Sequence, residues 1–377
     1  MADDFKVTPW EVKGNIDYDK LIHEFGVSKI DHQLVERISK ITGKEPHYFL
    51  RRGIFFAHRD LKFILDEYEK GNKFFLYTGR APSGHIHMGH LIPWMFTKWL
   101  QDVFDVELWF QFPDEEKFLF KENLTLEDTE KFTYENMLDV IALGFDPKKT
   151  KFIVDTKHAG IMYPEAIKVA KKITFSTAKA AFGFTNEQNL GAIFYTAMQA
   201  VPAFLPCVIH KRKIPCLIPH AIDQDPHFRV SRDVIPKLGY YKPASIQCRF
   251  LPGLRGMAED GKMSTSSGEN ATIYTIDDEK TVKNKINKYA FSGGKDTVEE
   301  HRKHGGDPDI DVAYQWLTFF EEDDVRLKQI HDDYSSGKLL SGEIKNILIE
   351  KLNDFLKEHQ GKREAAKKKI DKFIYQA

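Results

Sequence analysis

Short β-prone runs alternate with longer helical stretches from residue 73 onward, and this alternation constrains the fold more than any other feature of the sequence. Helix-period stretches, such as residues 126–143 and 186–200, separate the runs. Strands separated by whole helices form parallel crossovers, so the sequence predicts an α/β fold on a doubly wound parallel sheet. Ligands of such sheets bind beyond the carboxyl ends of the strands, and chemistry is expected in the loops that follow the runs. The predicted strands are residues 74–78, 106–112, 152–155 and 245–250.

Changes in the pattern of strand-like and helical segments divide the chain into three parts. Residues 1–72 mix an extended opening with helical patterns, including a helix predicted between an Asp31 cap and Gly43. Residues 73–267 hold the strand and helix alternation, and residues 268–377 are dominated by helical periods. We therefore expect a sheet domain with an N-terminal extension packed on it, and a C-terminal helical domain whose last helix can return to the sheet domain.

Charge and composition exclude several classes of protein. Lys and Arg total 55 and Asp and Glu total 56, so a net charge of -1 excludes a polybasic factor that binds nucleic acid over its whole surface. Apolar residues at 42% and charged residues at 29% exclude a largely disordered chain. No apolar run is long enough to span a membrane, and the acidic start resembles no secretory signal. Three cysteines without a CxxC pair predict neither disulfides nor a zinc site, so a cytoplasmic protein is expected.

One cationic cluster lies near the C-terminus. Such a run is more often a solvated helix face than a binding site, although RNA contact is compatible with it. Its members are Lys362, Arg363, Lys367, Lys368, Lys369 and Lys372.

The first motif that carries chemistry is the segment 77–90, where a strand is expected to end and a helix to begin. Glycines and Pro82 form a turn, and the helix then starts at His87, Gly89 and His90. An anion at this helix start would meet free backbone N–H groups and the positive end of the helix dipole. His87 and His90 share one helical face and can donate to phosphate oxygens together, while Gly89 leaves room for a flat base. Metal binding or two packed core histidines are the alternatives, and the turn with its glycines favours the anion site.

The second motif is the Lys-Met-Ser string that begins at Lys262, within a Gly- and Ser-rich stretch. A lysine followed by Ser264 and Ser266 on a flexible backbone suits pyrophosphate, because it offers one charge and several donors. Lone strings of this kind occur by chance. Here the string follows the first motif after the parallel-sheet pattern, and the combination is specific.

Together the two motifs resemble the fingerprints of class I aminoacyl-tRNA synthetases, the His-x-Gly-His motif and the Lys-Met-Ser-Lys-Ser loop. The resemblance narrows to the tryptophanyl-tRNA synthetases of the eukaryotic and archaeal type, and it extends from about residue 9 to about residue 360. It implies a Rossmann-like catalytic domain with a C-terminal helical anticodon-binding domain. The strings that carry it are residues 50–58, 91–93, 96–104, 216–219, 221–226 and 290–294.

The resemblance implies roles for individual residues. An indole N–H is only a donor, so it needs an acceptor such as a tyrosine oxygen or an amide carbonyl. The residues implied in tryptophan binding are Tyr77, Gly79, Gln111, Glu116, Gln199, Gln224 and Phe228. Those implied in ATP binding are Arg80, Pro82, Gly89, His90, Lys262, Met263 and Ser266. Those implied in catalysis are His87, His90, Lys262 and Ser264, with no metal held by the protein itself.

The sequence departs from the family pattern at three places. Four residues, 83–86, separate Pro82 from His87, one fewer than in many eukaryotic relatives. Thr265 replaces the second lysine of the loop, so the charge falls mainly on Lys262. His220 stands near the amino-acid pocket where some relatives have cysteine, as a neutral lining residue or a titrating one.

The implied activity is that of a tryptophan–tRNA ligase, which uses ATP and Mg²⁺, acts on tryptophan and tRNA(Trp), and works as a cytoplasmic homodimer. Tyrosyl-tRNA synthetase, which shares the fold and both motifs, is the alternative. Gln111, Glu116 and the Phe-Ser-Gly-Gly string that ends at Gly294 speak against it. The long helical segment after Lys262 speaks against a small nucleotidylyltransferase. The intact motif residues speak against a non-catalytic RNA-binding relative.

Overall fold

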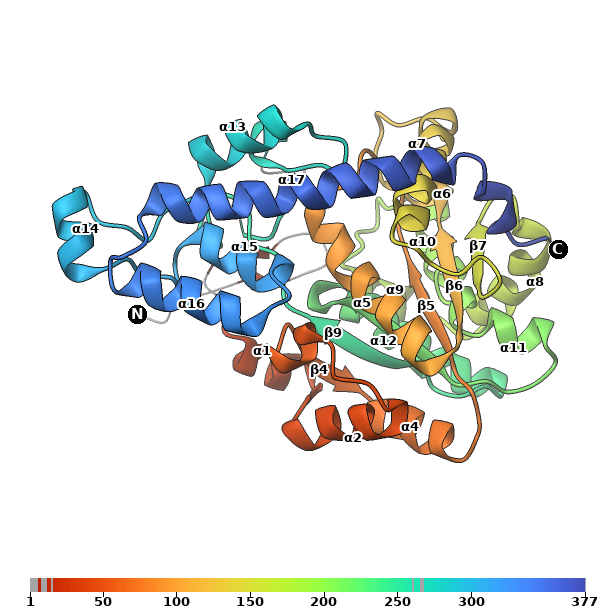
Figure 1. Ribbon diagram of the computed structural model, residues 1–377. Coiled ribbons are helices and arrows are strands. Elements are labelled where there is room, and N and C mark those ends of the chain that lie inside the picture. The colour runs from red at the N-terminus through yellow and green to blue at the C-terminus, as the bar shows by residue number, and fades with distance from the viewer. Residues whose placement is uncertain (1–5, 8–11, 15, 260, 265–267, 377) are drawn as a thin grey trace.

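A seven-stranded sheet forms the centre of the protein in the computed structural model (Figure 1). The structure describes residues 6–7, 12–14, 16–259, 261–264 and 268–376. The sheet order is β3-β4-β9-β8-β5-β6-β7, and a separate ribbon pairs β1 (Lys6–Val7) with β2 (Val12–Lys13). The strands of the sheet are β3 (Ser28–Lys29), β4 (Phe55–Arg59), β5 (Phe75–Gly79), β6 (Glu107–Phe112), β7 (Thr150–Val154), β8 (Cys216–Ala221) and β9 (Ala244–Cys248).

The strands from β9 to β7 run parallel, which confirms the predicted doubly wound α/β fold. All four predicted runs form strands, at β5, β6, β7 and β9. β6 is buried along almost its whole length, as expected of a parallel strand covered on both faces. Two antiparallel strands from the first 72 residues, β4 and β3, extend the sheet beyond β9.

Sequence reasoning missed β8 and β4. β8 contains Pro219 and His220, and β4 contains His58 and Arg59. Because Pro lacks an N–H donor and His and Arg are uncommon in buried strands, neither run has the composition of a buried strand. Both segments are strands because they pair with β9, which lies between them in the sheet.

Helices cover both faces of the sheet and continue into a helical C-terminal part (Figure 1). On one face, α5 and α7 share an apolar core with α13 and α15–α17; on the other, α8–α12 share a second core. The helices up to the end of the sheet are α1 (Tyr18–Phe25), α2 (His32–Thr42), α3 (Tyr48–Arg51), α4 (Leu61–Glu69), α5 (Met88–Phe104), α6 (Asp114–Phe120), α7 (Leu126–Ala142), α8 (Ala159–Ala170), α9 (Phe175–Phe182), α10 (Leu190–Met198), α11 (Leu205–Ile209) and α12 (Asp225–Val234). The C-terminal helices are α13 (Glu279–Tyr289), α14 (Val298–His304), α15 (Val312–Phe320), α16 (Asp324–Ser335) and α17 (Ser341–Ala366).

Capping residues define both ends of α2. Asp31 accepts a hydrogen bond from the backbone N–H of Leu34 at the start of α2, and Gly43 ends the helix with a left-handed backbone (φ 64°). Both features confirm the helix predicted between these residues. Capping side chains and glycines act within one turn, which is why the sequence alone reveals them.

The long helix α17 joins the helical part to the sheet domain. It runs across the molecule and packs on α7 (Figure 1). At this contact the buried His359 ring lies 2.9 Å from the Asp139 carboxylate. After α17 the chain returns to the sheet edge. There the backbone N–H of Phe152 in β7 donates to Phe373 O at 2.7 Å, and the N–H of Tyr375 donates to Phe152 O at 3.0 Å.

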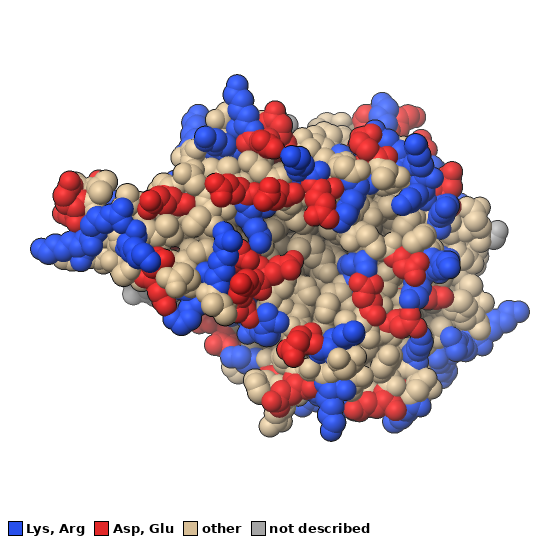
Figure 2. Space-filling view, in the orientation of Figure 1, with Lys and Arg blue, Asp and Glu red and all other residues tan. Residues whose placement is uncertain are grey.

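Three of the six residues of the cationic cluster near the C-terminus pair with carboxylates of the protein. Arg363 is almost buried and pairs with Glu135 and Asp139 of α7. Lys362 pairs with Glu358, and Lys367 pairs with Glu364. Positive and negative side chains are likewise interspersed over the face of the molecule in Figure 2. Among the helices of the described residues, none is long and apolar enough to cross a membrane.

The sheet places one position under a strict steric limit. Gly79 ends β5 beside Gln111 of β6, and a Cβ at Gly79 would lie 2.7 Å from the Gln111 carbonyl oxygen. Any larger residue would push the two strands apart. The backbone N–H of Arg80 donates to the same carbonyl at 2.9 Å, which fixes the direction in which the chain leaves the sheet.

Candidate active site

The chain reverses the direction of its winding at β5, and this reversal positions the candidate site. α5 and α7, which follow β5 and β6, pack on one face of the sheet. The helices that follow β7 and β8 pack on the other face. Loops that leave the carboxyl ends of β5 and β8 therefore diverge, and an α/β sheet binds its ligands at such a point. Both predicted motifs meet here.

Tyr77 and Gln111 lie side by side at this edge, from β5 and β6. The Tyr77 hydroxyl donates to Gln111 Oε1 at 2.6 Å, and Gln111 Nε2 donates to Asp155 Oδ2 at 2.7 Å. All three side chains are buried. Phe228 of α12 stands edge-on to Tyr77, with ring centroids 6.0 Å apart. The arrangement is an apolar wall with one short line of polar groups along it.

Glu116 of α6 closes one side of this region. Its carboxylate accepts hydrogen bonds from Lys117 Nζ at 2.6 Å and from the Tyr195 hydroxyl at 2.9 Å. Burial raises the pKa of Glu116, but Lys117, His227 and the Tyr195 hydroxyl together outweigh burial and hold that pKa below its ordinary value. Glu116 is therefore ionised and available to a cation or an ammonium group.

Gln199, Gln224 and His220 border the same space, each half-buried or buried. Gln199 contributes its carbonyl oxygen, 3.4 Å from the Tyr77 hydroxyl, and Gln224 Nε2 donates to Asp223 at 3.0 Å. His220 Nδ1 lies 2.9 Å from the carbonyl oxygen of Ala221. Burial lowers the pKa of His220, so the ring is a neutral lining residue.

The histidines of the first motif open α5 as predicted, and their rings stack with centroids 3.5 Å apart. The backbone N–H of His87 donates to His90 Nδ1 at 3.3 Å, so the proton of the neutral His90 ring is on Nε2. Burial lowers the pKa of both rings well below the ordinary histidine value, and the nearby Arg80 cation adds to this. The pair therefore offers neutral N–H donors rather than charge.

The short turn before His87 is held from two sides. Asn136 of α7 donates to the carbonyl oxygen of Gly84 at 3.0 Å. On the other side, the backbone N–H of Met88 donates to Ile273 O at 3.0 Å. Pro82 is buried at the start of this turn, and Arg80 is half-buried with no hydrogen-bond partner for its Nε. Burial lowers the pKa of Arg80 to about 10, so the guanidinium remains charged at neutral pH.

The second motif lies directly against the first. A Cβ at Gly89 would come within 3.2 Å of both the His87 ring and Met263 Cβ. Met263 is buried, and its backbone N–H donates to Leu251 O at 2.7 Å. The backbone oxygen of Ser264 accepts a hydrogen bond from the Thr272 hydroxyl at 2.8 Å. Thr265 and Ser266 lie outside the described residues.

Lys262 is paired with a carboxylate in this structure. Its Nζ donates to Asp223, which is 2% exposed, and lies 5.6 Å from the centre of the Phe250 ring. Asp223 follows β8 at the same edge of the sheet. Lys262 thus directly precedes Met263, which packs near the His87 ring, and the Asp223 carboxylate compensates its charge.

Three carboxyl groups of this region escaped sequence reasoning: Glu115, Asp155 and Asp223. Asp155 is the last residue of the strand predicted at residues 152–155, and Asp223 lies within a string that carried the family resemblance. Both positions were therefore visible in the sequence. Their partners were not, because Gln111 and Lys262 lie 44 and 39 residues away along the chain.

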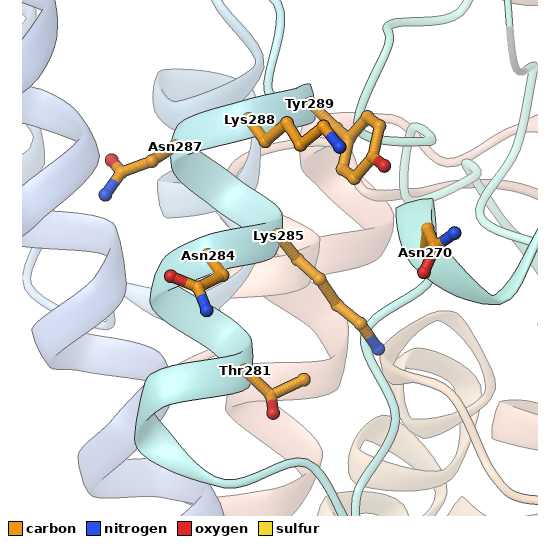
Figure 3. A pocket seen from close by; sticks show the side chains of 7 residues that line it. All are labelled: Asn270, Thr281, Asn284, Lys285, Asn287, Lys288 and Tyr289. Carbon is orange, nitrogen blue, oxygen red and sulfur yellow. The ribbon is translucent and has the colours of Figure 1, made fainter.

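A separate cavity of about 640 Å³ lies against α13 (Figure 3). Its lining is rich in amide and ammonium groups, and Lys285 extends from α13 toward the segment that carries Asn270. Lys285 Nζ donates to Thr272 O and to Asp277 Oδ2, each at 2.7 Å. The lining residues are Asn270, Thr281, Asn284, Lys285, Asn287, Lys288 and Tyr289.

Comparison with known proteins gives one consistent result. Residues 69–357 match the family model of tRNA synthetases class I (W and Y). The tryptophan–tRNA ligase of Sulfurisphaera tokodaii is 55% identical over 376 residues, which cover 100% of this chain and 96% of that protein. The cytoplasmic tryptophan–tRNA ligase of Saccharomyces cerevisiae is 49% identical over 98% of this chain and 88% of its own. The crystal structure of Plasmodium falciparum tryptophanyl-tRNA synthetase superposes with a TM-score of 0.90 at 43% identity, covering 96% of this chain and 98% of its own.

Proposed function

The chain belongs to the class I tRNA synthetases (W and Y), and we propose from that membership that it is a tryptophan–tRNA ligase. It activates tryptophan with ATP to tryptophanyl-AMP and pyrophosphate, and then transfers the tryptophanyl group to the terminal adenosine of tRNA(Trp). The observation that carries the proposal is identity of 50% or more along the full chain with curated tryptophan–tRNA ligases. Tyrosyl-tRNA synthetase, the alternative within the family, is not favoured by these relatives.

The proposed tryptophan pocket is the wall built on Tyr77 and Gln111. Because the Tyr77 hydroxyl gives its hydrogen to Gln111, the lone pairs of its oxygen remain to accept the indole N–H. Glu116 and the amides of Gln199 and Gln224 are assigned to the α-amino and carboxylate groups. Phe228 packs on the ring, and Gly79 keeps β5 and β6 close enough for Tyr77 and Gln111 to form this wall.

The proposed ATP site combines the start of α5 with the Lys262 loop. The neutral N–H groups of His87 and His90 donate to phosphate oxygens, and Gly89 lets the His87 ring and Met263 pack against the start of α5 beside the nucleotide. Lys262 leaves Asp223 for the pyrophosphate, supported by Arg80 and by the loop residues Met263, Ser264 and Ser266. The tryptophan carboxylate attacks the α-phosphorus and pyrophosphate leaves; catalysis is by positioning and charge stabilisation, without an enzyme nucleophile.

Magnesium is proposed to reach the site as part of the substrate, bound to the ATP phosphates. Among the described residues, no group of three or more His, Cys, Asp or Glu could hold a metal ion. The cations that this chain itself places near the phosphates are Arg80 and Lys262.

The helical part, residues 268–377, is proposed to bind the anticodon arm of tRNA, and α13 offers the surface for its backbone. Lys283 and Lys288 are exposed on α13, and Lys288 Nζ lies 5.1 Å from the centre of the Tyr289 ring. Ammonium groups beside amides and an aromatic ring suit phosphates and unstacked bases. We also propose a cytoplasmic homodimer, in keeping with the cytoplasmic relative from yeast.

The function is tested by pyrophosphate exchange with tryptophan and with tyrosine in separate reactions. We expect exchange with tryptophan. The kcat/KM for tyrosine should be lower by at least about 10⁴-fold, because an amino acid without an indole N–H leaves the Tyr77 oxygen unpaired. Charging of tRNA by the same preparation completes the test. Exchange that prefers tyrosine would replace the proposal with the alternative.

Lys262→Ala tests the loop. It should lower the rate of adenylate formation by about 100-fold, since one phosphate donor is lost in the transition state, while tryptophan binding in calorimetry stays within about twofold. Lys338→Ala, which removes a lysine paired with Asp333 on the surface, is the control. Equal losses in catalysis and tryptophan binding would contradict the assigned role.

The α13 surface is tested by the double change Lys283→Glu and Lys288→Glu. Each lost phosphate contact weakens RNA binding and flattens its salt dependence, so the KM for tRNA should rise about tenfold at moderate salt while pyrophosphate exchange is unchanged. Lys40→Glu, at an exposed position of α2 at the far side of the molecule, is the matched control (Figure 1). If both proteins charge tRNA equally well, α13 does not bind it.

A further inference from the structure

Asp155 stands at the end of β7 on the same face of the sheet as Tyr77 and Gln111. Gln111 is in register with Ile153, and Asp155 lies two residues beyond Ile153. Side chains two apart along an extended chain point to the same face. Three neighbouring strands, β5, β6 and β7, therefore each contribute one polar side chain to a continuous line, of which only the first two were assigned to the ligand.

The contact with Asp155 decides which way the Gln111 amide points. Gln111 Nε2 donates to Asp155 Oδ2 at 2.7 Å, which leaves Gln111 Oε1 facing the Tyr77 hydroxyl at 2.6 Å. A flipped amide would place its carbonyl oxygen against the Asp155 oxygen, where two acceptors repel. The acceptor at Asp155 thus selects the orientation in which Gln111 takes the hydrogen of Tyr77.

Asp155 in turn has an acidic partner. Its carboxyl group hydrogen-bonds with that of Glu115, from the start of α6. Asp155 Oδ1 and Glu115 Oε2 are both buried, and neither accepts a hydrogen bond from a donor of the protein. Two buried carboxyl groups in contact cannot both be ionised, and a single proton between these two oxygens satisfies both.

The electrostatics of the surroundings agree with a shared proton. Burial raises the pKa of Glu115 to about 7. Burial, and then the Glu115 charge, raise the pKa of Asp155 well above its ordinary value. The groups that face Asp155 from the packed elements are Glu115 and Asp114 on α6, Tyr77 on β5 and Tyr195 on α10.

We propose that Asp155 is a positioning residue for tryptophan recognition: through one proton shared with Glu115, it fixes the amide of Gln111 so that the Tyr77 oxygen is left to accept the indole N–H. The proposal rests on the proposed function. It assigns Asp155 no contact with the substrate. It also predicts a proton-dependent pocket, because removal of the shared proton leaves two buried carboxylates in contact.

The direction of the pH effect follows from the raised pKa values. A carboxyl group whose pKa is raised in the folded state favours that state while it is protonated, and this contribution is lost as the pH rises through the folded-state pKa. The ordered pocket should therefore persist at low pH and weaken at high pH. The KM for tryptophan of the wild-type enzyme should rise as the pH rises from about 6 to about 9.

Two substitutions separate positioning from a general structural role. Asp155→Ala removes the acceptor that orients Gln111 and should raise the KM for tryptophan about tenfold, with the KM for ATP within about twofold. Asp155→Asn keeps an oxygen for Gln111 and supplies Glu115 with a permanent N–H. It should restore the tryptophan KM and make it independent of pH. Asp139→Ala, which removes another buried carboxylate from its partner His359, is the matched control for lost stability.

The outcomes distinguish this proposal from its premise. An unchanged tryptophan KM in Asp155→Ala, or equal changes in the KM for tryptophan and ATP as in Asp139→Ala, would overturn the positioning role. If Asp155→Ala does not fold, the pH profile of Asp155→Asn decides, and a profile like that of the wild type overturns the shared proton. Failure of the wild type to exchange pyrophosphate with tryptophan would instead contradict the proposed function.

Discussion

The reversal of winding at β5 is the constraint on which the rest of the structure depends. Helices that follow β5 and β6 must pack on one face of the sheet, and helices that follow β7 and β8 on the other. The loops that follow β5 and β8 therefore turn to opposite faces of the sheet. The space between these loops is covered by neither layer of helices. Gly79 shows how closely the strands meet below that space, because no side chain fits between β5 and the Gln111 carbonyl.

Polar groups in this space are buried, so each must find a partner within the protein or in a ligand. Tyr77, Gln111 and Asp155 are hydrogen-bonded in series along one side. Asp223 compensates Lys262 on the other. The hydrogen bonds that begin at Tyr77 leave its oxygen free to accept from a donor. The pair of Lys262 and Asp223 holds a cation that can bind an anion instead. An indole N–H and a phosphate are the ligands with the matching chemistry.

Features that depend on neighbouring residues were predictable, and features that depend on pairing across the sheet were not. The α2 cap at Asp31, the helix start at His87 and the strands at β5, β6, β7 and β9 follow from local sequence. β8 and β4 were missed because distant strands, and not their own composition, hold them in the sheet.

The same distinction applies to the candidate site. The Lys-Met-Ser string reveals Lys262, but its pairing with Asp223 appears only once β8 is placed. The predicted role of Ser266 falls outside the described residues. The Phe-Ser-Gly-Gly string has a structural reason that sequence alone did not provide. A Cβ at Gly293 would lie 2.0 Å from the Asp307 carbonyl oxygen, so this glycine is required by close packing in the helical part.

The Tyr77 oxygen, held by Gln111, is proposed to accept the indole N–H of tryptophan. Calorimetry with a ligand that differs in this one atom tests the proposal most directly. Titration of the wild-type protein with tryptophan and with the analogue that carries sulfur in place of the indole nitrogen compares ligands of similar shape. A pocket with a buried acceptor loses that partner in the analogue, so the analogue should bind at least about tenfold more weakly. Equal affinities for the two ligands would contradict the account.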